Sequence, residues 1–305
     1  MLDAYQLNIF LVGAETLNFT ETAKRLHMTQ PSVSQHVKAI EKNFGCSLFV
    51  RKGRHLELTD AGRALVPLAS DLVKHSILIE ETMESLKGEV YGHLLVGCCT
   101  TPGKYILPHI LTNFHSIYPQ VTISCNVTIQ EQAIRMLDNG EIHLILTNKD
   151  TSCFTNAESR HFLKDPVVLI APKNHPWAEK EEISPEEMFE SSFIMREPDS
   201  GTYGAAQIGM EKIGMNIKDL KSILSLGNSE AIALAVQEGL GVGFVSSLVV
   251  EKFCCNRVAP IKVKGLEMWQ DIYLGYQTRR PPTAAQIAFW KFSENINPLE
   301  FYSED

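Results

Sequence analysis

The first forty residues of this chain carry an apolar pattern that short, closely packed helices satisfy. Leu7, Phe10, Leu11 and Ala14 recur at the spacing of one helix face, which predicts a first helix. Thr20 is a candidate N-cap for a second helix, because its hydroxyl can accept a hydrogen bond from the free backbone N–H groups of a first turn. The chain is therefore expected to begin with a small helical module.

A tight break at residues 27–29 separates the second helix from a third, whose buried face is marked by Val33, Val37 and Ile40. Two helices joined by such a short turn form a helix-turn-helix. The other face of the third helix carries polar side chains suited to the base edges and phosphates of a DNA major groove. These candidate DNA-binding residues are Thr29, Gln30, Ser32, Ser34, Gln35 and Lys38.

A basic segment with one glycine follows, between the apolar runs 48–50 and 56–58, and predicts a β-hairpin wing. Its cations Arg51, Lys52 and Arg54 would lie against a phosphate backbone or in the minor groove. Taken alone, the segment could equally be a basic surface loop.

Charge is distributed unevenly along the chain. The net charge of −8 disfavours a nucleic-acid binder, but residues 24–63 hold eight Lys or Arg against three acidic residues, a net +5. The remaining residues then carry −13. A short basic module fused to a large acidic body indicates that only the N-terminal part meets a polyanion.

A long helix is predicted from Thr59 onward, with an apolar seam spaced alternately by four and three residues. Such a seam requires a partner helix and predicts dimerisation, although a helix packed on its own domain would show a similar, broader stripe. The seam residues are Leu65, Ala69, Leu72, Ser76, Ile79, Met83 and Leu86.

Beyond Gly88 and Gly92 short apolar runs alternate with helical stretches, which predicts a parallel α/β architecture. Helices are expected at 106–118, 130–139 and 230–238. Strands are expected at 94–98, 121–127, 144–147, 167–171, 193–195, 223–226, 243–245 and 272–277.

Composition excludes several classes of protein. With 305 residues, 44% hydrophobic and 21% charged, the chain is expected to fold into two or three globular domains. No apolar stretch reaches the ~18 residues that a membrane span needs, and no charged-then-apolar leader opens the sequence. We expect a cytoplasmic protein without membrane contact.

Cysteine usage and motif order give no sign of catalysis. The odd count of seven cysteines, without a CxxC pair, predicts reduced and mostly buried thiols, with redox sensing by one such as Cys153 as the alternative. The glycine run 239–243 lies between a helix and a strand, the reverse of the order in a dinucleotide-binding loop. No metal-ligand cluster or nucleophile elbow is evident, so we expect no metal, no cofactor and no catalytic residues.

Seven segments carry a family resemblance that extends over essentially the whole chain. They are 19–26 (FTETAKRL), 29–41 (TQPSVSQHVKAIE), 48–51 (LFVR), 58–62 (LTDAG), 196–202 (REPDSGT), 228–232 (NSEAI) and 239–243 (GLGVG). The chain resembles the LysR-type transcriptional regulators. Its 196–202 segment looks most like the branch that regulates carbon fixation and sulfur assimilation.

This resemblance implies an α/β protein with an all-α-type N-terminal winged helix-turn-helix at 1–60 and a dimerising linker helix at 61–90. A two-lobed, periplasmic-binding-protein-like effector domain would follow, with lobe I at 91–165 and 269–300 and lobe II at 166–268. It also implies double-stranded DNA and a small-molecule effector as partners, and a homotetramer built from two dimers. A solute-binding receptor and an enzyme on the α/β body are the alternatives, but neither accounts for residues 1–60.

Turns that lead into helices are expected to form the effector cleft, because free N–H groups at helix N-termini bind anions. Thr100 and Thr101 precede one such helix, Ser200, Gly201 and Thr202 a second, and Asn228 a third, although each segment alone could be a helix cap. The resemblance adds Thr128, Thr147 and Ser246 to the cleft and implies a small, anionic metabolite. Tyr203 stands where related sequences often have Arg, which weakens the case for a dianionic ligand; Arg196 could compensate or form a structural ion pair.

Overall fold

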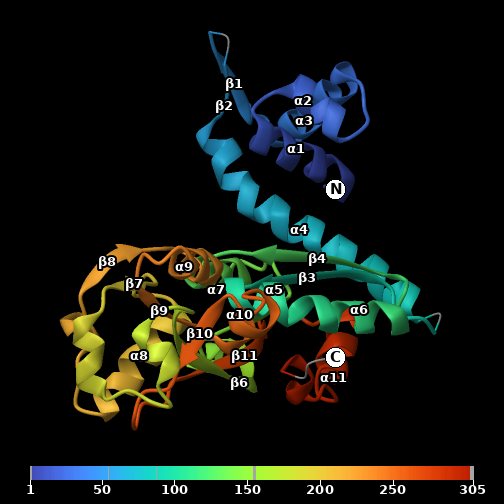
Figure 1. The fold of residues 1–305 in the computed structure, drawn as a ribbon. Helices are drawn as coiled ribbons and strands as arrows, with labels where there is room; N and C mark the ends of the chain where they lie inside the picture. The colour runs from blue at the N-terminus through green and yellow to red at the C-terminus, as the bar shows by residue number, and fades with distance from the viewer. Residues whose placement is uncertain (1, 54, 87, 154–155, 303–305) are drawn as a thin grey trace. The chain divides into compact units, whose positions relative to one another are not determined.

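The computed structural model describes residues 2–53, 55–86, 88–153 and 156–302, and the chain divides into two compact units, Met1–Glu89 and Val90–Asp305 (Figure 1). The predicted Arg54 lies outside the described residues. No helix in the described ranges is long and apolar enough to cross a lipid bilayer.

The N-terminal unit begins with three helices, α1 (Ala4–Thr16), α2 (Phe19–Arg25) and α3 (Gln30–Phe44). Phe10 of α1 and Val37 and Ile40 of α3 are almost completely buried in one apolar cluster, as the helical spacing predicts. The short break between α2 and α3 gives the expected helix-turn-helix.

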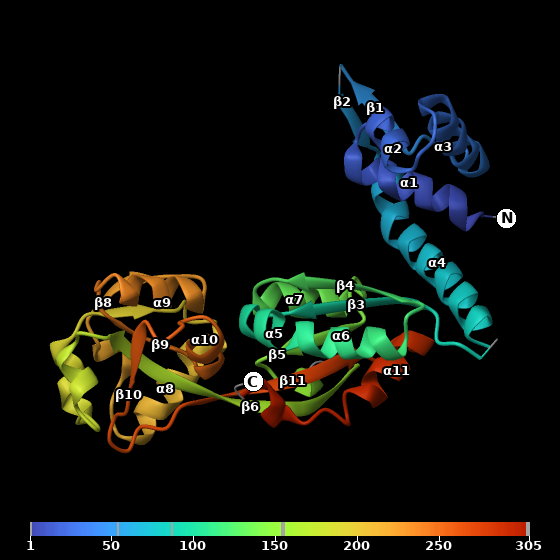
Figure 2. The ribbon, with the colours of Figure 1, turned by 45° about the vertical axis from the view of Figure 1, so that its right-hand side comes forward.

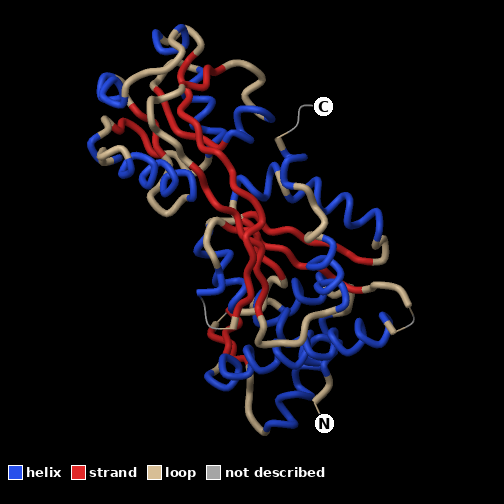
Figure 3. Tube along the Cα trace, turned by 90° about the horizontal axis from the view of Figure 1, so that it is seen from below, coloured by secondary structure: helices blue, strands red, loops and turns tan. Residues whose placement is uncertain are grey.

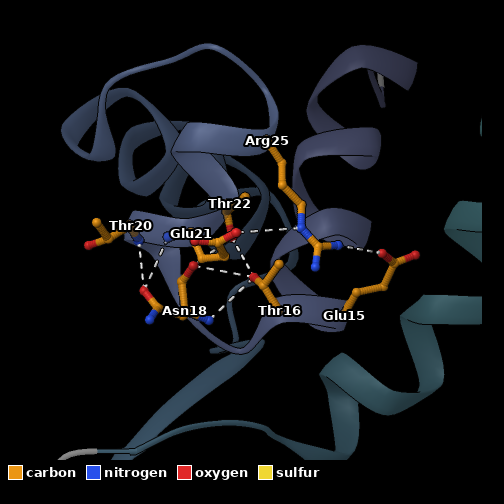
Figure 4. A network of polar contacts seen from close by, with 7 residues as sticks. All are labelled: Glu15, Thr16, Asn18, Thr20, Glu21, Thr22 and Arg25. Carbon is orange, nitrogen blue, oxygen red and sulfur yellow. Dashed lines mark hydrogen bonds and ion pairs between the residues drawn. The ribbon is translucent and has the colours of Figure 1, made fainter.

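The N-cap of α2 is Asn18 and not Thr20 as predicted from the sequence. The Asn18 side chain accepts hydrogen bonds from the backbone N–H groups of Thr20 and Glu21, and Thr20 lies inside the helix (Figure 4). Asn18 also accepts, through its backbone carbonyl, a hydrogen bond from the buried Thr22 hydroxyl at 2.9 Å. Asparagine is as strong an N-cap as serine or threonine, so the sequence alone did not separate the two candidates.

The predicted wing is a two-stranded antiparallel hairpin of β1 (Phe49–Lys52) and β2 (His55–Leu58), in which Lys52 lies opposite His55. The Glu41 carboxylate on α3 accepts hydrogen bonds from the backbone N–H groups of Leu48 and Phe49, at 2.8 and 3.3 Å. These bonds fix the base of the wing against the end of α3.

The long helix α4 (Asp60–Ser85) starts at the N-cap Thr59, as predicted, and carries Pro67 in its interior. Its apolar seam serves two purposes. Leu65 and Ala69 are buried in the core of the N-terminal unit, whereas Ile79, Met83 and Leu86 are 58–75% exposed. Only the later part of the seam is therefore open to a partner helix.

The second unit contains a sheet, whose strands are drawn in red in Figure 3. The strands follow the order β4-β3-β5-β11-β6-β9-β7-β8, with β10 paired to β6. Its strands are β3 (Gly92–Cys98), β4 (Val121–Val127), β5 (Leu144–Thr147), β6 (Ala157–Pro172), β7 (Phe193–Met195), β8 (Ser222–Ser225), β9 (Val242–Ser246), β10 (Val258–Ile261) and β11 (Trp269–Gln277). Its α-helices are α5 (Thr100–Tyr105), α6 (Leu107–Ile117), α7 (Gln130–Asp138), α8 (Gly201–Lys212), α9 (Ser229–Gln237), α10 (Ser247–Lys252) and α11 (Ala284–Phe292).

The predicted parallel arrangement is found in the outer parts of the sheet but not in the two strands in its middle. β3 pairs in parallel with β4 and β5, and β7 with β8 and β9, but β6 and β11 run antiparallel to each other and to their other neighbours. The first half of β6 carries Glu158, Arg160 and Lys164, so it is not a continuous apolar run and was not predicted as a strand. Residues 158–161 are all polar, and each of them is exposed or half-buried, so this part of the strand lies at the surface.

β6 runs through both lobes of the second unit, and β11 pairs with its first part, from Ala157 to Pro166 (Figure 2). Leu163 and Ile272 belong to the apolar core of the lobe that contains β3–β5, whereas Val167 and Met268 belong to the core of the lobe that contains β7–β9. β6 thus changes core between Leu163 and Val167, and the chain changes core again between Met268, which precedes β11, and Ile272 within it. The lobes meet at this point.

Removing the α2 cap tests the local assignment. Asn18→Ala is expected to lower the free energy of unfolding by about 1 kcal/mol, because two first-turn N–H groups lose their acceptor. Thr20→Ala, at an exposed position of the same turn, is expected to change it by less than about 0.5 kcal/mol. Urea unfolding of the full chain followed by far-ultraviolet circular dichroism measures both; equal losses would contradict Asn18 as the cap.

Candidate effector cavity and DNA-binding surface

A cavity of about 450 Å³ lies between the two lobes, at the N-terminal ends of α5, α7 and α8. The parallel strands β3 and β5 end beside it, which is where open α/β sheets bind ligands. The lining residues are Cys99, Thr100, Thr101, Thr128, Ile129, Gln130, Glu131, Asn148, Lys149, Arg196, Glu197, Asp199, Ser200, Gly201, Thr202 and Gln270.

Seven of the predicted effector-binding residues are brought together around this cavity: Thr100, Thr101, Thr128, Arg196, Ser200, Gly201 and Thr202. The other three are not in its lining. Thr147 is fully buried at the end of β5. Asn228 and Ser246 act as N-caps of α9 and α10 and accept hydrogen bonds from the N–H groups of Ala231 and Leu248. The helix-cap alternative stated for Asn228 thus describes its contacts, and Ser246, for which no such alternative was stated, also caps a helix.

Several polar lining residues were not predicted from the sequence. Asn148 and Lys149 directly follow β5, Gln130 begins α7, and Gln270 is the second residue of β11. Their position at the carboxyl end of a strand or the start of a helix is the signal that could have identified the first three. Gln270 has no such signal, because only the crossing of the lobes brings it to the cavity.

Two of the three helices at the cavity begin without a side-chain cap. The N-cap residues of α5 and α7 are Cys99 and Ile129, and neither accepts a hydrogen bond from the first turn of its helix. In α8 the Ser200 hydroxyl accepts from the N–H of Tyr203. The first residues of both helices line the cavity, and the N-terminus of a helix carries the positive end of the helix dipole, which favours an anion there.

Two cations, Arg196 and Lys149, belong to the lining of the cavity. Arg196 is 8% exposed. Its guanidinium donates two hydrogen bonds to Glu197, at 2.9 and 2.7 Å, and a third to the Ser229 hydroxyl at 3.2 Å. Burial opposes ionisation of Glu197, but the hydrogen bonds and charge of Arg196 hold its pKa below the usual value. Arg196 is thus engaged in an ion pair, and the exposed Lys149 is the second lining cation.

A chain of side-chain hydrogen bonds leads from the cavity to the crossing strands. The Cys99 thiol donates a hydrogen bond to the side-chain oxygen of Asn148 (3.2 Å), and the Asn148 NH2 group donates to the side-chain oxygen of Gln270 (3.1 Å). The Gln270 NH2 group in turn donates to the Asp165 carboxylate. The Tyr302 hydroxyl donates to the other Asp165 oxygen (3.1 Å). Because a carboxylate accepts and does not donate, ionised Asp165 fixes which way the two amide groups point.

Close contacts hold the lobes together on both sides of the cavity. A Cβ atom on Gly201, in the lobe of β7–β9, would lie 2.5 Å from Cγ of Asn148 in the other lobe, so only glycine fits. Elsewhere between the lobes, the Glu230 carboxylate of α9 accepts a hydrogen bond from the Tyr105 hydroxyl at 2.8 Å and pairs with the Lys104 ammonium at 3.0 Å. The described structure is therefore one in which the two lobes touch.

The cysteines are not mostly buried, contrary to the prediction. Cys98, Cys99 and Cys254 are buried, whereas Cys46, Cys125, Cys153 and Cys255 are exposed. Burial raises the pKa of the Cys99 thiol in the cavity wall. Among the residues that the structure describes, no group of three or more His, Cys, Asp or Glu side chains is arranged to hold a metal ion.

The predicted DNA-binding face of α3 is accessible in the N-terminal unit. Thr29 is also the N-cap of the helix, and its hydroxyl accepts a hydrogen bond from the N–H of Ser32 at 3.4 Å. The helix side chains on this face that are exposed or half-buried are Gln30, Ser32, Ser34, Gln35 and Lys38.

On the wing, Arg51 and Lys52 are exposed on β1. The Lys52 ammonium lies 2.8 Å from the Glu57 carboxylate of β2, and this hydrogen bond lowers the pKa of Glu57. Arg51 is therefore the wing cation of β1 that is placed to meet a phosphate without first breaking this cross-strand pair.

A winged helix-turn-helix and a two-lobed domain with a cavity between its lobes define the class of ligand-responsive DNA-binding regulators. The family model for bacterial regulatory helix-turn-helix proteins of the lysR family matches residues 5–63, and that for the LysR substrate binding domain matches residues 87–295. The chain belongs to the LysR family of transcriptional regulators. Its second unit is the substrate-binding domain of that family.

Individual relatives agree with this assignment. An uncharacterised HTH-type transcriptional regulator of Methanocaldococcus jannaschii is 33% identical over 94% of this chain and 97% of its own length. The RuBisCO operon transcriptional regulator of Allochromatium vinosum is 31% identical over 94% of each chain, in line with the resemblance to regulators of carbon fixation. The regulatory domain of Synechocystis CcmR, solved with 2-phosphoglycolate, is 26% identical with a TM-score of 0.59, covering 66% of this chain and 95% of that one.

The pKa of Asp165 generates a prediction for pH dependence. Burial, opposed by hydrogen bonds from Gln270, Ser246 and Tyr302, raises the pKa of Asp165 to about 6 from 3.8. The folded state thus binds a proton more tightly than the unfolded state, so this group's contribution to stability is greatest below pH 4 and is lost as the pH rises towards 6. Relative to Asp165→Asn, the free energy of unfolding of the unsubstituted protein should fall by about 2 kcal/mol between pH 4.5 and 7.5.

Urea titrations of both proteins at several pH values measure this difference. If the difference in free energy of unfolding between the two proteins did not change with pH, the pKa of the Asp165 carboxyl group would not be raised in the folded state.

Proposed function

We propose that this regulator is controlled by a small carboxylate- or phosphate-bearing metabolite bound in the cavity between its lobes. The observation that carries the proposal is the convergence of three helix N-termini, two of them without a side-chain cap, on one opening. The hydroxyls of Thr100, Thr101 and Thr202 supply further donors. The ligand of the CcmR relative, 2-phosphoglycolate, is a small anion of this class and is the first compound to test.

The charge of the lining sets a limit on that ligand. Arg196 is already paired with Glu197, and Glu131 and Asp199 add two further acidic groups to the lining. Lys149 is the cation that lies nearest to solvent in the lining. We therefore favour a ligand whose charge is met by backbone N–H groups and one ammonium over a ligand that needs an arginine fork.

The N-terminal unit would bind double-stranded DNA with α3 in the major groove. Ser32, Ser34 and Gln35 would contact base edges, Lys38 and Arg51 the phosphates, and Thr29, Gln30 and Lys52 would lie at the borders of the contact. Arg54 is assigned to the same wing on sequence alone.

Assembly follows from the later part of α4. The exposed Leu72, Ile79, Met83 and Leu86 would pair with the same residues of a second copy, giving a homodimer, and two dimers would form a tetramer. Effector binding would change lobe closure, and through it the spacing of the α3 helices on DNA. We place this assembly in the cytoplasm and assign it no enzymatic activity.

The solute-binding receptor remains the second candidate, because the two-lobed second unit with its cavity suits that function when considered alone. A solute-binding receptor, however, has no use for α3 and the wing. Binding of the full chain to an operator DNA fragment, measured with and without an added anion, separates the two candidates. A regulator binds the fragment with an affinity that the anion changes, whereas a solute-binding receptor does not bind it.

Gly201 provides the sharpest test of the cavity. A ligand at about 100 times its dissociation constant should stabilise the protein by about 2.7 kcal/mol, measured as a shift in thermal unfolding with 2-phosphoglycolate, phosphate, sulfate and small carboxylates. Gly201→Ala should weaken binding at least about tenfold, because its Cβ would displace Asn148 or separate the lobes.

Gly204→Ala, one turn along α8, is the matched control. Its Cβ would meet no atom within 4 Å, so binding should persist and stability should rise by up to about 1 kcal/mol. Equal binding by both variants, or no shift with any anion, would contradict the proposed site.

The DNA-binding assignment predicts two different losses. Arg51→Ala should weaken binding to all sequences and reduce the slope of log affinity against log salt by about one. Gln35→Ala should cost about 1–3 kcal/mol on the specific site and leave binding to random DNA unchanged. Fluorescence anisotropy with both kinds of DNA at several salt concentrations measures these effects, and an unchanged slope for Arg51→Ala would rule out the wing contact.

A further inference from the structure

Two thiols that neither the cavity nor the DNA-binding surface uses lie side by side in the second unit. Cys98 is the last residue of β3 and is fully buried, whereas Cys125 lies on the edge strand β4 and is exposed. Their sulfur atoms are 3.7 Å apart. The protein thus presents one thiol to solvent with a second, protected thiol directly behind it.

The parallel register of β3 and β4 explains why these thiols meet. Val96 pairs with Cys125 and Cys98 pairs with Val127, so the two cysteines are diagonal neighbours on the same face of the sheet. Helix α5 covers Cys98: a Cβ atom on Gly103 would lie 2.5 Å from the sulfur of Cys98 and 2.8 Å from Val127. The backbone and the helix above therefore hold the two sulfurs in contact.

The hydrogen bond between the two groups gives them different acidities. The bond from Cys98 lowers the pKa of the Cys125 thiol, whereas the same bond, together with burial, raises the pKa of Cys98. A thiolate on Cys125 is the stronger nucleophile and is the one that solvent reaches, while Cys98 keeps its proton. Cys125 thus has the properties of an attacking cysteine and Cys98 those of a resolving cysteine.

We propose that Cys98 and Cys125 form an oxidisable dithiol site that takes a small hydroperoxide as its oxidant and closes into an intrachain disulfide. In the first step the Cys125 thiolate attacks the terminal peroxide oxygen, the O–O bond breaks, and the leaving oxygen takes a proton from water. Cys125 is then a sulfenic acid. In the second step the Cys98 sulfur attacks the Cys125 sulfur, the S–O bond breaks, and hydroxide leaves with the Cys98 proton as water. Two thiols and one hydroperoxide thus give one disulfide, one alcohol (water, from hydrogen peroxide) and one water.

Closure of the disulfide would act on the cavity through α5. The sulfur–sulfur distance must shorten from 3.7 Å to about 2.0 Å, so the Cys98 side chain must change its packing beneath Gly103. The first residues of the same helix, Thr100 and Thr101, line the cavity. Formation of the disulfide itself does not depend on the proposed ligand, whereas its effect on anion binding does.

The test uses the full-length protein, reduced with dithiothreitol, freed of reductant and exposed to one equivalent of hydrogen peroxide. We expect an intact mass lower by about 2 Da, restored by dithiothreitol. Peptide mapping under non-reducing conditions should link Cys98 to Cys125 before any product forms at Cys46, Cys153 or Cys255. Cys125→Ser should abolish this link, and the matched variant Cys153→Ser, at another exposed cysteine, should retain it.

Cys99, the N-cap residue of α5, directly follows Cys98 in the chain, so Cys99→Ser tests which of the two forms the disulfide. The link to Cys125 should persist in this variant. Mass increases of about 16 or 32 Da at Cys125 without a cross-link would overturn the proposal, as would cross-links between chains that form as readily as the link within one chain. Folding of each variant is checked by its thermal unfolding, so that loss of the link is not confused with loss of structure.

Discussion

The antiparallel pairing of β6 with β11 is the interaction on which the second unit depends. The two strands pair from Trp269 opposite Pro166 to Gln277 opposite Ala157. β6 contributes to both cores, whereas β11 contributes to the core of β3–β5 and directly follows Met268 of the other core. Because each lobe also contains parallel strands that end towards the other lobe, helix N-termini from both sides face one opening. The position of the cavity is therefore set by the topology of the strands and not by particular side chains.

The electrostatics of the cavity follow from the same arrangement. Backbone N–H groups at the starts of α5 and α7 have no side-chain acceptor, whereas the buried Arg196 has two in Glu197. Such a site attracts an anion without an unpaired buried cation, which would be costly in the absence of ligand. Asp165 affects the lining indirectly. It accepts a hydrogen bond from Gln270, and Gln270 in turn accepts one from the Asn148 amide and so orients it.

Much of this could be predicted from the sequence, and the failures have physical causes. Elements with a strong periodic or apolar signal, such as α3, β4 and β5, were predicted closely. The first half of β6 was missed because its polar residues interrupt the apolar run, and Gln270 was missed because it reaches the cavity only through pairing between distant strands. Asn18 and Thr20 show a further limit: two good caps two residues apart are distinguished only by the backbone that forms.

The same reasoning explains why the site could be predicted only in part. Hydroxyl-bearing turns before helices identify possible anion sites, but they do not show which of them face the same opening. Ser200–Thr202 and Thr100–Thr101 do, while Asn228 caps a helix whose start lies outside the lining. Tertiary structure decides between a cap and a ligand, since both use the same hydroxyl or amide and the same helix end.

The measurement that tests this account most directly is a crystal structure of the protein with the tightest-binding anion of the thermal-unfolding panel. The account predicts the anion between the starts of α5, α7 and α8, within hydrogen-bonding distance of backbone N–H groups in the first turns of α5 and α7. An anion bound elsewhere, or held only by surface lysines while this cavity contains solvent, would contradict it.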